Sequence, residues 1–140
     1  MQFEYRPKPI ESLKSNYSER RRQKLNGFND FSDFLNWYQS QEKECYYCGL
    51  TEQESQEIVT TGLLRSNRFP QNGLNGRGTS RGVWLEIDRL DPKGLYSRQN
   101  SVLCCYFCNN DKSDVFYGAN YREFFQNRTS YLRKILGNRQ

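Results

Sequence analysis

Histidine is absent from this chain of 140 residues, and the 16 acidic residues are outnumbered by 21 basic ones. The chain therefore lacks the side chain that most often serves as a metal ligand or a general base. It also has no apolar run long enough to span a bilayer, and its first residues, MQFEYRPKP, lack the apolar region of a signal peptide. These absences predict a cytoplasmic protein without a membrane partner.

Apolar residues are also scarce, at 35% of the chain against 26% for charged residues. A chain of this length and polarity is expected to form one domain with a small core, and small cores often depend on a bound metal or a second subunit. The net charge of +5 and the pI of about 9.0 suit a polyanionic partner without identifying one.

Four of the five cysteines form two C-x2-C pairs, Cys45 with Cys48 and Cys105 with Cys108. Zinc binds four soft or borderline ligands in a tetrahedron, and a chain without histidine supplies them most simply as thiolates. We predict one structural zinc ion per subunit, because a closed four-thiolate site leaves no position for water or substrate. The alternative is four unrelated buried thiols. Cys104 should point away from the metal because side chains alternate along a strand, and a frame shifted onto it would break the two-residue spacing.

The stretch 83–113 is typical of two strands followed by a helix. Apolar side chains alternate with others over residues 83–87, which is the pattern of a half-buried strand, and residues 102–103 resume it after a long loop. The second cysteine pair then begins a helix. Asp88 ends the first strand and Asn109 enters the helix, so the two can hold one hard cation. The sequence predicts an α+β fold with a small zinc-stabilised core and flanking helices.

Helices are predicted on both sides of this core. Residues 1–42 form an arm and two helices, of which the first spans residues 13–25 and the second is capped by Asp30 or Ser32. Residues 43–116 form the core, and residues 117–140 form a closing amphipathic helix. A capping box of Thr51 and Glu54 starts a short helix within the core. The apolar residues of the second and closing helices are Phe31, Phe34, Leu35, Tyr38, Tyr121, Phe124, Phe125, Leu132 and Ile135.

Basic residues gather on the first helix and in the loop 62–82, which has five glycines and no acidic residue. The helix presents either a solvated charged face or a phosphate-binding surface. The loop is either a tolerated surface insertion or a flexible DNA-contacting loop. Lys112 either contacts phosphate or is solvated. The candidate DNA-binding residues are Arg20, Arg21, Arg22, Lys24, Arg65, Arg68, Arg77, Arg81 and Lys112.

The motifs between residues 44 and 116 resemble those of the zinc-bound HNH (ββα-metal, treble-clef-like) endonucleases. These motifs are C-x2-C-G, then I-D-R at the end of a strand, then Asn100, then C-x2-C-N-x2-K. Most of that family has a histidine general base after the metal-binding aspartate, and here the position is Arg89. Arginine stays protonated and cannot abstract a proton from water. The protein is therefore either an inactive nuclease or one in which another residue performs this step.

Within that family, D-R, Y-S-x-Q-N and C-x2-C-N-x2-K-S are similar to a rare-cutting restriction enzyme in which arginine likewise replaces histidine and a tyrosine initiates cleavage. The resemblance implies Asp88 and Asn109 as ligands of a catalytic Mg²⁺ or Mn²⁺, Arg89 as a cationic partner, and Tyr96 as nucleophile or base. Asn100 is expected to structure the loop through backbone hydrogen bonds. That relative has a second, N-terminal zinc site, and no cysteine precedes Cys45 here, so a target sequence does not carry over.

We therefore expect a sequence-specific double-stranded DNA endonuclease of restriction type, acting as a homodimer without a small-molecule substrate. A free-standing homing or phage nicking enzyme has the same catalytic residues. The alternative from another class is a zinc-stabilised nucleic-acid-binding module without catalysis. In that case Asp88 caps the hairpin and Tyr96 packs or stacks on DNA. Divalent-dependent cleavage that disappears with Tyr96→Phe separates these hypotheses.

Overall fold

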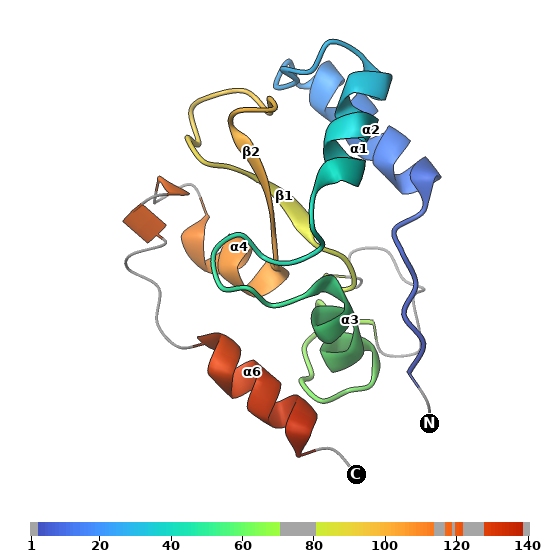
Figure 1. The fold of residues 1–140 in the computed structure, drawn as a ribbon, viewed down its shortest axis with the longest axis vertical. Coiled ribbons are helices and arrows are strands. Elements are labelled where there is room, and N and C mark those ends of the chain that lie inside the picture. Colours follow the sequence, from blue (N-terminus) through green and yellow to red (C-terminus); the bar gives the residue numbers. More distant parts are fainter. Residues whose placement is uncertain (1–2, 71–80, 114–116, 119, 122–127, 139–140) are drawn as a thin grey trace.

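A computed structural model describes residues 3–70, 81–113, 117–118, 120–121 and 128–138. The chain folds as an α+β unit, in which a two-stranded sheet lies between two groups of helices (Figure 1). In chain order the elements are α1 (Ile10–Arg22), α2 (Phe31–Ser40), α3 (Glu52–Thr60), β1 (Glu86–Arg89), β2 (Ser101–Cys104), α4 (Tyr106–Lys112) and α6 (Arg128–Gly137).

The expected strand–strand–helix unit is confirmed. β1 and β2 pair antiparallel, with Glu86 opposite Cys104 and Asp88 opposite Val102. α4 follows β2 directly and packs against β1 (Figure 1). Leu85, Ile87 and Leu103 are buried, so this face of the sheet contributes to the apolar core.

The first strand begins at Glu86, and the prediction that it begins at residue 83 is wrong. Two buried side chains of α3 bind the backbone of this segment: Glu52 accepts a hydrogen bond from the Leu85 N–H at 2.8 Å, and Gln56 donates to the Val83 carbonyl at 3.0 Å. These backbone groups are satisfied by side chains of α3, so they need no strand partner.

The helices α1 and α2 pack together through aromatic rings. Tyr17 of α1 lies 5.7 Å from Phe34 of α2 between ring centroids, and Phe34 also contacts Phe28 and Trp37. All four rings are buried. Of the predicted stripe, Phe34 and Tyr38 are buried and Phe31 and Leu35 are partly buried against the core, so its interpretation as core is confirmed. α1 starts three residues earlier than predicted, after Pro9, whose extended conformation ends the N-terminal arm.

The caps of the next two helices are also confirmed. Asp30 accepts a hydrogen bond from the Asp33 N–H at 2.9 Å and caps α2. Thr51 and Glu54 form both hydrogen bonds of a capping box at the start of α3. The N-terminal arm runs beside α3, where the backbone of Arg6 binds the Gln56 side chain at its N–H and its carbonyl oxygen.

The closing helix is described from residue 128 as α6, which packs on α3. Leu132 and Leu136 are buried, and Arg133 binds Glu54 across the two helices. The predicted core residues Phe124 and Phe125, and Arg77 of the basic loop, lie outside the described residues. None of the described helices is long and apolar enough to cross a membrane.

Candidate functional site

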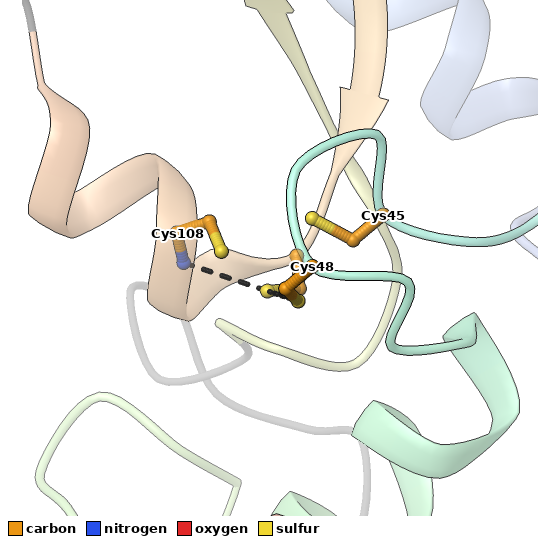
Figure 2. Close-up of side chains that lie close together, drawn as sticks. Cys45, Cys48 and Cys108 are labelled. Carbon is orange, nitrogen blue, oxygen red and sulfur yellow. Dashed lines mark hydrogen bonds between the residues drawn. The ribbon is translucent and has the colours of Figure 1, made fainter. Parts of the chain in front are cut away.

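Four thiols meet where the two cysteine pairs come together. The Sγ atoms of Cys45, Cys48, Cys105 and Cys108 all lie within 4.8 Å of one another. Cys45 and Cys48 belong to the loop before α3, and Cys108 lies in the first turn of α4 (Figure 2). Cys105 is the N-cap residue of the same helix. The predicted clustering of the two pairs is confirmed.

The geometry of this cluster fits a tetrahedral zinc ion. With Zn–S bonds of about 2.3 Å, the sulfur atoms of such a site are about 3.8 Å apart, and Cys48 Sγ lies 3.8 Å from Cys105 Sγ. The Cys108 N–H donates to Cys105 Sγ at 3.4 Å (Figure 2). Hydrogen bonds with Cys105 and Cys108 lower the pKa of Cys48, and hydrogen bonds with Cys108, Cys45 and Cys48 raise the pKa of Cys105. The thiols thus share protons with one another, and a bound metal would require all four as thiolates.

Cys104 is fully buried and is not part of this cluster. Burial raises its pKa well above the usual value, so the thiol stays neutral. This placement agrees with the expectation that the side chain before Cys105 points away from the metal.

The Asp88 carboxylate is held by two buried partners. The Tyr47 hydroxyl donates to its Oδ2, and Lys112 Nζ lies 3.1 Å from the same oxygen. Burial, followed by the hydrogen bond to Asp88, raises the pKa of Tyr47, so its hydroxyl remains a donor. Lys112 is 0% exposed and also donates to the Arg89 carbonyl. In this arrangement Lys112 is neither solvated nor available to a phosphate at the surface.

Asn109 points toward a second acid on β1. Its Nδ2 donates to Oε1 of Glu86 at 2.7 Å, and Arg81 binds the same carboxylate with Nε and Nη2. The amide oxygen Oδ1 is therefore the atom of Asn109 that can accept a cation. Two separate contacts therefore connect β1 and α4, one between Asp88 and Lys112 and one between Glu86 and Asn109, and no direct contact joins Asp88 to Asn109 among the described residues.

Tyr96 lies in the connection between the two strands, next to two guanidinium groups. Cζ of Arg89 is 4.9 Å from the ring centroid, and Cζ of Arg20 from α1 is 4.4 Å from it. Arg89 also donates to the Gly94 carbonyl at 2.9 Å, so it crosses the loop that carries Tyr96.

Asn100 holds this loop in shape. Its Oδ1 accepts from the Asp91 N–H at 2.9 Å, and its Nδ2 donates to the carbonyls of Asp91 and Leu95. Gly94 leaves room for these hydrogen bonds, because a Cβ at this position would lie 2.8 Å from Asn100 Nδ2. The placement suits the loop-structuring role expected of Asn100.

The candidate DNA-binding residues differ in their exposure. Arg20 contacts the Tyr96 ring and Arg81 is in an ion pair with Glu86 that leaves 41% of the Arg81 side chain exposed. The side chains of Arg21, Arg22, Lys24, Arg65 and Arg68 are exposed. Arg22 is in an ion pair with Glu19 of its own helix.

The overall fold of the chain is similar to that of a known protein. The chain matches no protein-family model and no curated protein sequence. Among solved structures it is similar to the rare-cutting HNH restriction endonuclease PacI, with 22% sequence identity and a TM-score of 0.60 over 90% of this chain and 78% of that chain. The chain has the fold of an HNH endonuclease. At this identity the similarity to PacI establishes the architecture, and the roles of individual residues rest on the geometry above.

Two residues of this site were missed by the sequence analysis. Glu86 precedes Asp88 by two positions, so the alternation of a strand places both on one face, and that signal was available. Tyr47 carries no such signal. It lies between Cys45 and Cys48 in sequence, and it reaches Asp88 because the cysteine cluster holds its loop against β2, where Tyr46 N–H binds the Leu103 carbonyl.

Proposed function

We propose that this protein is a metal-dependent endonuclease that hydrolyses phosphodiester bonds of double-stranded DNA at specific sequences. The observation that supports the proposal is the contact of the Tyr96 ring with Arg89, the residue that follows Asp88, in a chain with an HNH-endonuclease fold and no histidine. A tyrosine beside guanidinium groups offers an acid–base or nucleophilic group where an imidazole is lacking.

Asp88 and Asn109 are the residues that would hold the catalytic cation. Their oxygen donors suit Mg²⁺ or Mn²⁺, which keep several water ligands and need few protein ligands. Among the described residues, Oδ1 of Asp88 accepts one hydrogen bond, from Lys112 at 3.4 Å, and Nδ2 of Asn109 is used by Glu86. A bound divalent cation would polarise the scissile phosphate and stabilise the leaving 3′ oxygen.

Tyr96 would act as nucleophile or base, and Arg89 would support it. A free tyrosine has a pKa near ~10 and is a poor base at neutral pH. A positive charge close to the phenol favours its ionised form, and the guanidinium of Arg89 remains charged throughout. Arg89 thus stabilises the reactive form of Tyr96 without accepting a proton itself.

A homodimer is the simplest assembly for cutting both strands. Each chain carries one Tyr96 loop and one β1–α4 face, and a two-fold dimer presents two such sites to a palindromic target. Analytical ultracentrifugation with and without duplex DNA tests this part of the proposal; a monomer on DNA that still cuts both strands would contradict it.

The decisive experiment is a cleavage assay on plasmid and genomic DNA with untagged protein, in Mg²⁺ or in EDTA. A histidine tag must be avoided, because the chain has no histidine of its own and the tag would add imidazole groups that bind metal. We expect discrete fragments that disappear with EDTA and fall at least about 100-fold in rate with Tyr96→Phe. Tyr131→Phe is the matched control, because Tyr131 is 59% exposed on α6. Fragment ends give the target sequence.

The ion pair between Lys112 and Asp88 favours a second candidate, a zinc-stabilised nucleic-acid-binding module without catalysis. The ammonium group lies 3.1 Å from the carboxylate that a catalytic cation would use, and it is buried. If Lys112 keeps a cation out, DNA stays intact under every condition while a gel shift still reports binding. Cleavage that depends on Mg²⁺ excludes this candidate.

A further inference from the structure

The ring of Tyr96 contacts an arginine that is distant in sequence. Arg20 belongs to the third turn of α1, and its Cζ lies 4.4 Å from the Tyr96 ring centroid, closer than the 4.9 Å of Arg89. Its neighbours Arg21 and Arg22 are exposed. The basic run of α1 thus directs one of its three arginines into the proposed active site.

The backbone fixes this arrangement. Immediately after α1 the chain turns through Lys24, which has a left-handed φ of 61°, and residues 25–27 then run parallel to the Tyr96 loop. The Tyr96 N–H donates to the Leu25 carbonyl at 2.8 Å, and the Gly27 N–H donates to the Tyr96 carbonyl at 2.7 Å. The main chain of Tyr96 is therefore hydrogen-bonded to the segment that carries α1 into α2.

One N–H donor group of the Arg20 guanidinium is unused beside Tyr96. Its Nη1 is buried and has no hydrogen-bond partner among the described residues. Burial lowers the pKa of Arg20, and the charge of a nearby Tyr96 oxygen acts in the opposite direction. A buried N–H donor without a partner is costly, and a tyrosine oxygen that gains negative charge during reaction would supply the acceptor.

The two charged groups that contact the Tyr96 ring are both positive, Arg20 and Arg89. Lys8 of the N-terminal arm is near enough to Arg20 that this charge lowers its pKa after the effect of burial, while Glu52 and Glu86 raise it. No ion pair joins Arg20 or Arg89 to a carboxylate within the described part of the chain. Positive groups placed together without counter-charges repel one another, and the arrangement becomes favourable when an anion forms between them.

We propose that Arg20 is a positioning residue for Tyr96, which holds the ring by stacking and stabilises negative charge on its oxygen during strand cleavage. This inference rests on the proposed endonuclease function and adds a group from outside the HNH core. It also gives the N-terminal helices a role in catalysis, because α1 and the segment 25–27 together present Arg20 to the loop. The alternative is that Arg20 only packs α1 against the loop.

Cleavage kinetics separate these roles. We expect Arg20→Gln to lower kcat by about 100-fold, the effect of removing one preorganised donor, with KM changed by less than about threefold and the pH–rate profile moved to higher pH. Arg20→Lys keeps the charge and should recover part of kcat. Lys134→Gln removes an exposed positive charge of α6, outside the candidate DNA-binding residues, and should cleave like the wild type. An Arg20→Gln enzyme with wild-type kcat, or a loss that Arg20→Lys does not recover at all, overturns the proposal.

A second measurement does not depend on cleavage. Tyrosinate absorbance is followed through a pH titration, and the step that disappears in Tyr96→Phe is assigned to Tyr96. That step should move to higher pH in Arg20→Gln and by a smaller amount in Arg20→Lys, with thermal unfolding confirming that each variant is folded. An unchanged step overturns the role of Arg20. If the wild type does not cut DNA, the endonuclease proposal fails, and this titration still decides the relation between the two residues.

Discussion

At the scale of single residues, the proposed chemistry depends on the surroundings of Asp88. Lys112 is 0% exposed and forms an ion pair with this carboxylate, while the Tyr47 hydroxyl donates to the same oxygen. A buried charged pair is stabilising only while both partners are present, because either one alone is left uncompensated in a poorly solvated place. Asp88 is therefore a structural residue as well as a candidate metal ligand.

Lys112→Met should destabilise the fold by about 3 kcal/mol, because it leaves the Asp88 carboxylate buried without its counter-ion. Asp88→Asn should also be destabilising, and the double variant should cost clearly less than the sum of the two. Urea unfolding followed by circular dichroism measures all three. Strictly additive free energies of unfolding would contradict the coupling of the pair.

Glu86 is expected to orient Asn109 for the cation. In Glu86→Gln the new amide can donate to Oδ1 of Asn109 and so turn the metal-facing oxygen away; Arg81 also loses its charged partner. We expect the Mg²⁺ concentration for half-maximal cleavage to rise about 10-fold or more. The control is Glu11→Gln, an exposed acid in the first turn of α1. Identical Mg²⁺ titrations for the two variants would argue against this role.

At the scale of elements, helices decide where the strand and the loop lie. The side chains of α3 take the backbone hydrogen bonds of residues 83–85 and so shorten β1. The segment after α1 holds the Tyr96 loop, and Gly27 makes its close approach possible, since a Cβ there would lie 3.0 Å from the Tyr96 carbonyl oxygen.

Gly27→Ala should push the Tyr96 loop away by a few tenths of an ångström. The new methyl group would lie 3.0 Å from the Tyr96 carbonyl oxygen and from Cβ of Ser97, and 3.1 Å from Cβ of Leu95. Small displacements of a reacting group are costly, so we expect kcat to fall about 10-fold with thermal stability much less affected. Gly137→Ala is the matched control, since a Cβ at Gly137 meets no atom within 4 Å. Equal cleavage by both variants would show that the close approach does not position Tyr96.

At the scale of the whole molecule, the cysteine cluster joins segments that the small core alone holds weakly. It connects the loop before α3 to β2 and α4, and thereby places Tyr47 on Asp88. Metal-binding free energy in such a site is largely folding free energy. The integrity of the proposed active site is therefore linked to the occupancy of the four thiols.

Purified protein should contain one zinc ion per chain by elemental analysis. Cys48→Ser should lose the ion and much of the cooperative unfolding transition, and a chelator should do the same to the wild type. Cys104→Ser should keep the ion despite some loss of stability, because Cys104 is buried outside the cluster. Acidification should also release zinc, since thiolate ligands must give up their protons to bind. Full zinc content in Cys48→Ser would contradict the four-thiolate assignment.

The sequence by itself determined the features that depend on local spacing. Two C-x2-C pairs predicted the thiol cluster, alternation and the second pair predicted two strands and a helix, and Asp30, Thr51 and Glu54 predicted two helix starts. Such signals are carried by residues a few positions apart, where backbone geometry alone fixes which side chains meet. The catalytic role of Tyr96 also came from a local motif, and it stays a prediction.

Only the tertiary structure decided the contacts between distant segments. Arg20 on the Tyr96 ring, Tyr47 and Lys112 on Asp88, and Arg81 on Glu86 all depend on how separate elements pack. Periodicity places a residue on a face, but it does not say which face of which other element lies opposite. For the same reason the basic residues of α1 and of the loop before β1 looked equivalent in sequence. In the folded chain, packing places Arg20 on the Tyr96 ring and Arg81 on the Glu86 carboxylate, and leaves Arg21, Arg22 and Arg68 exposed.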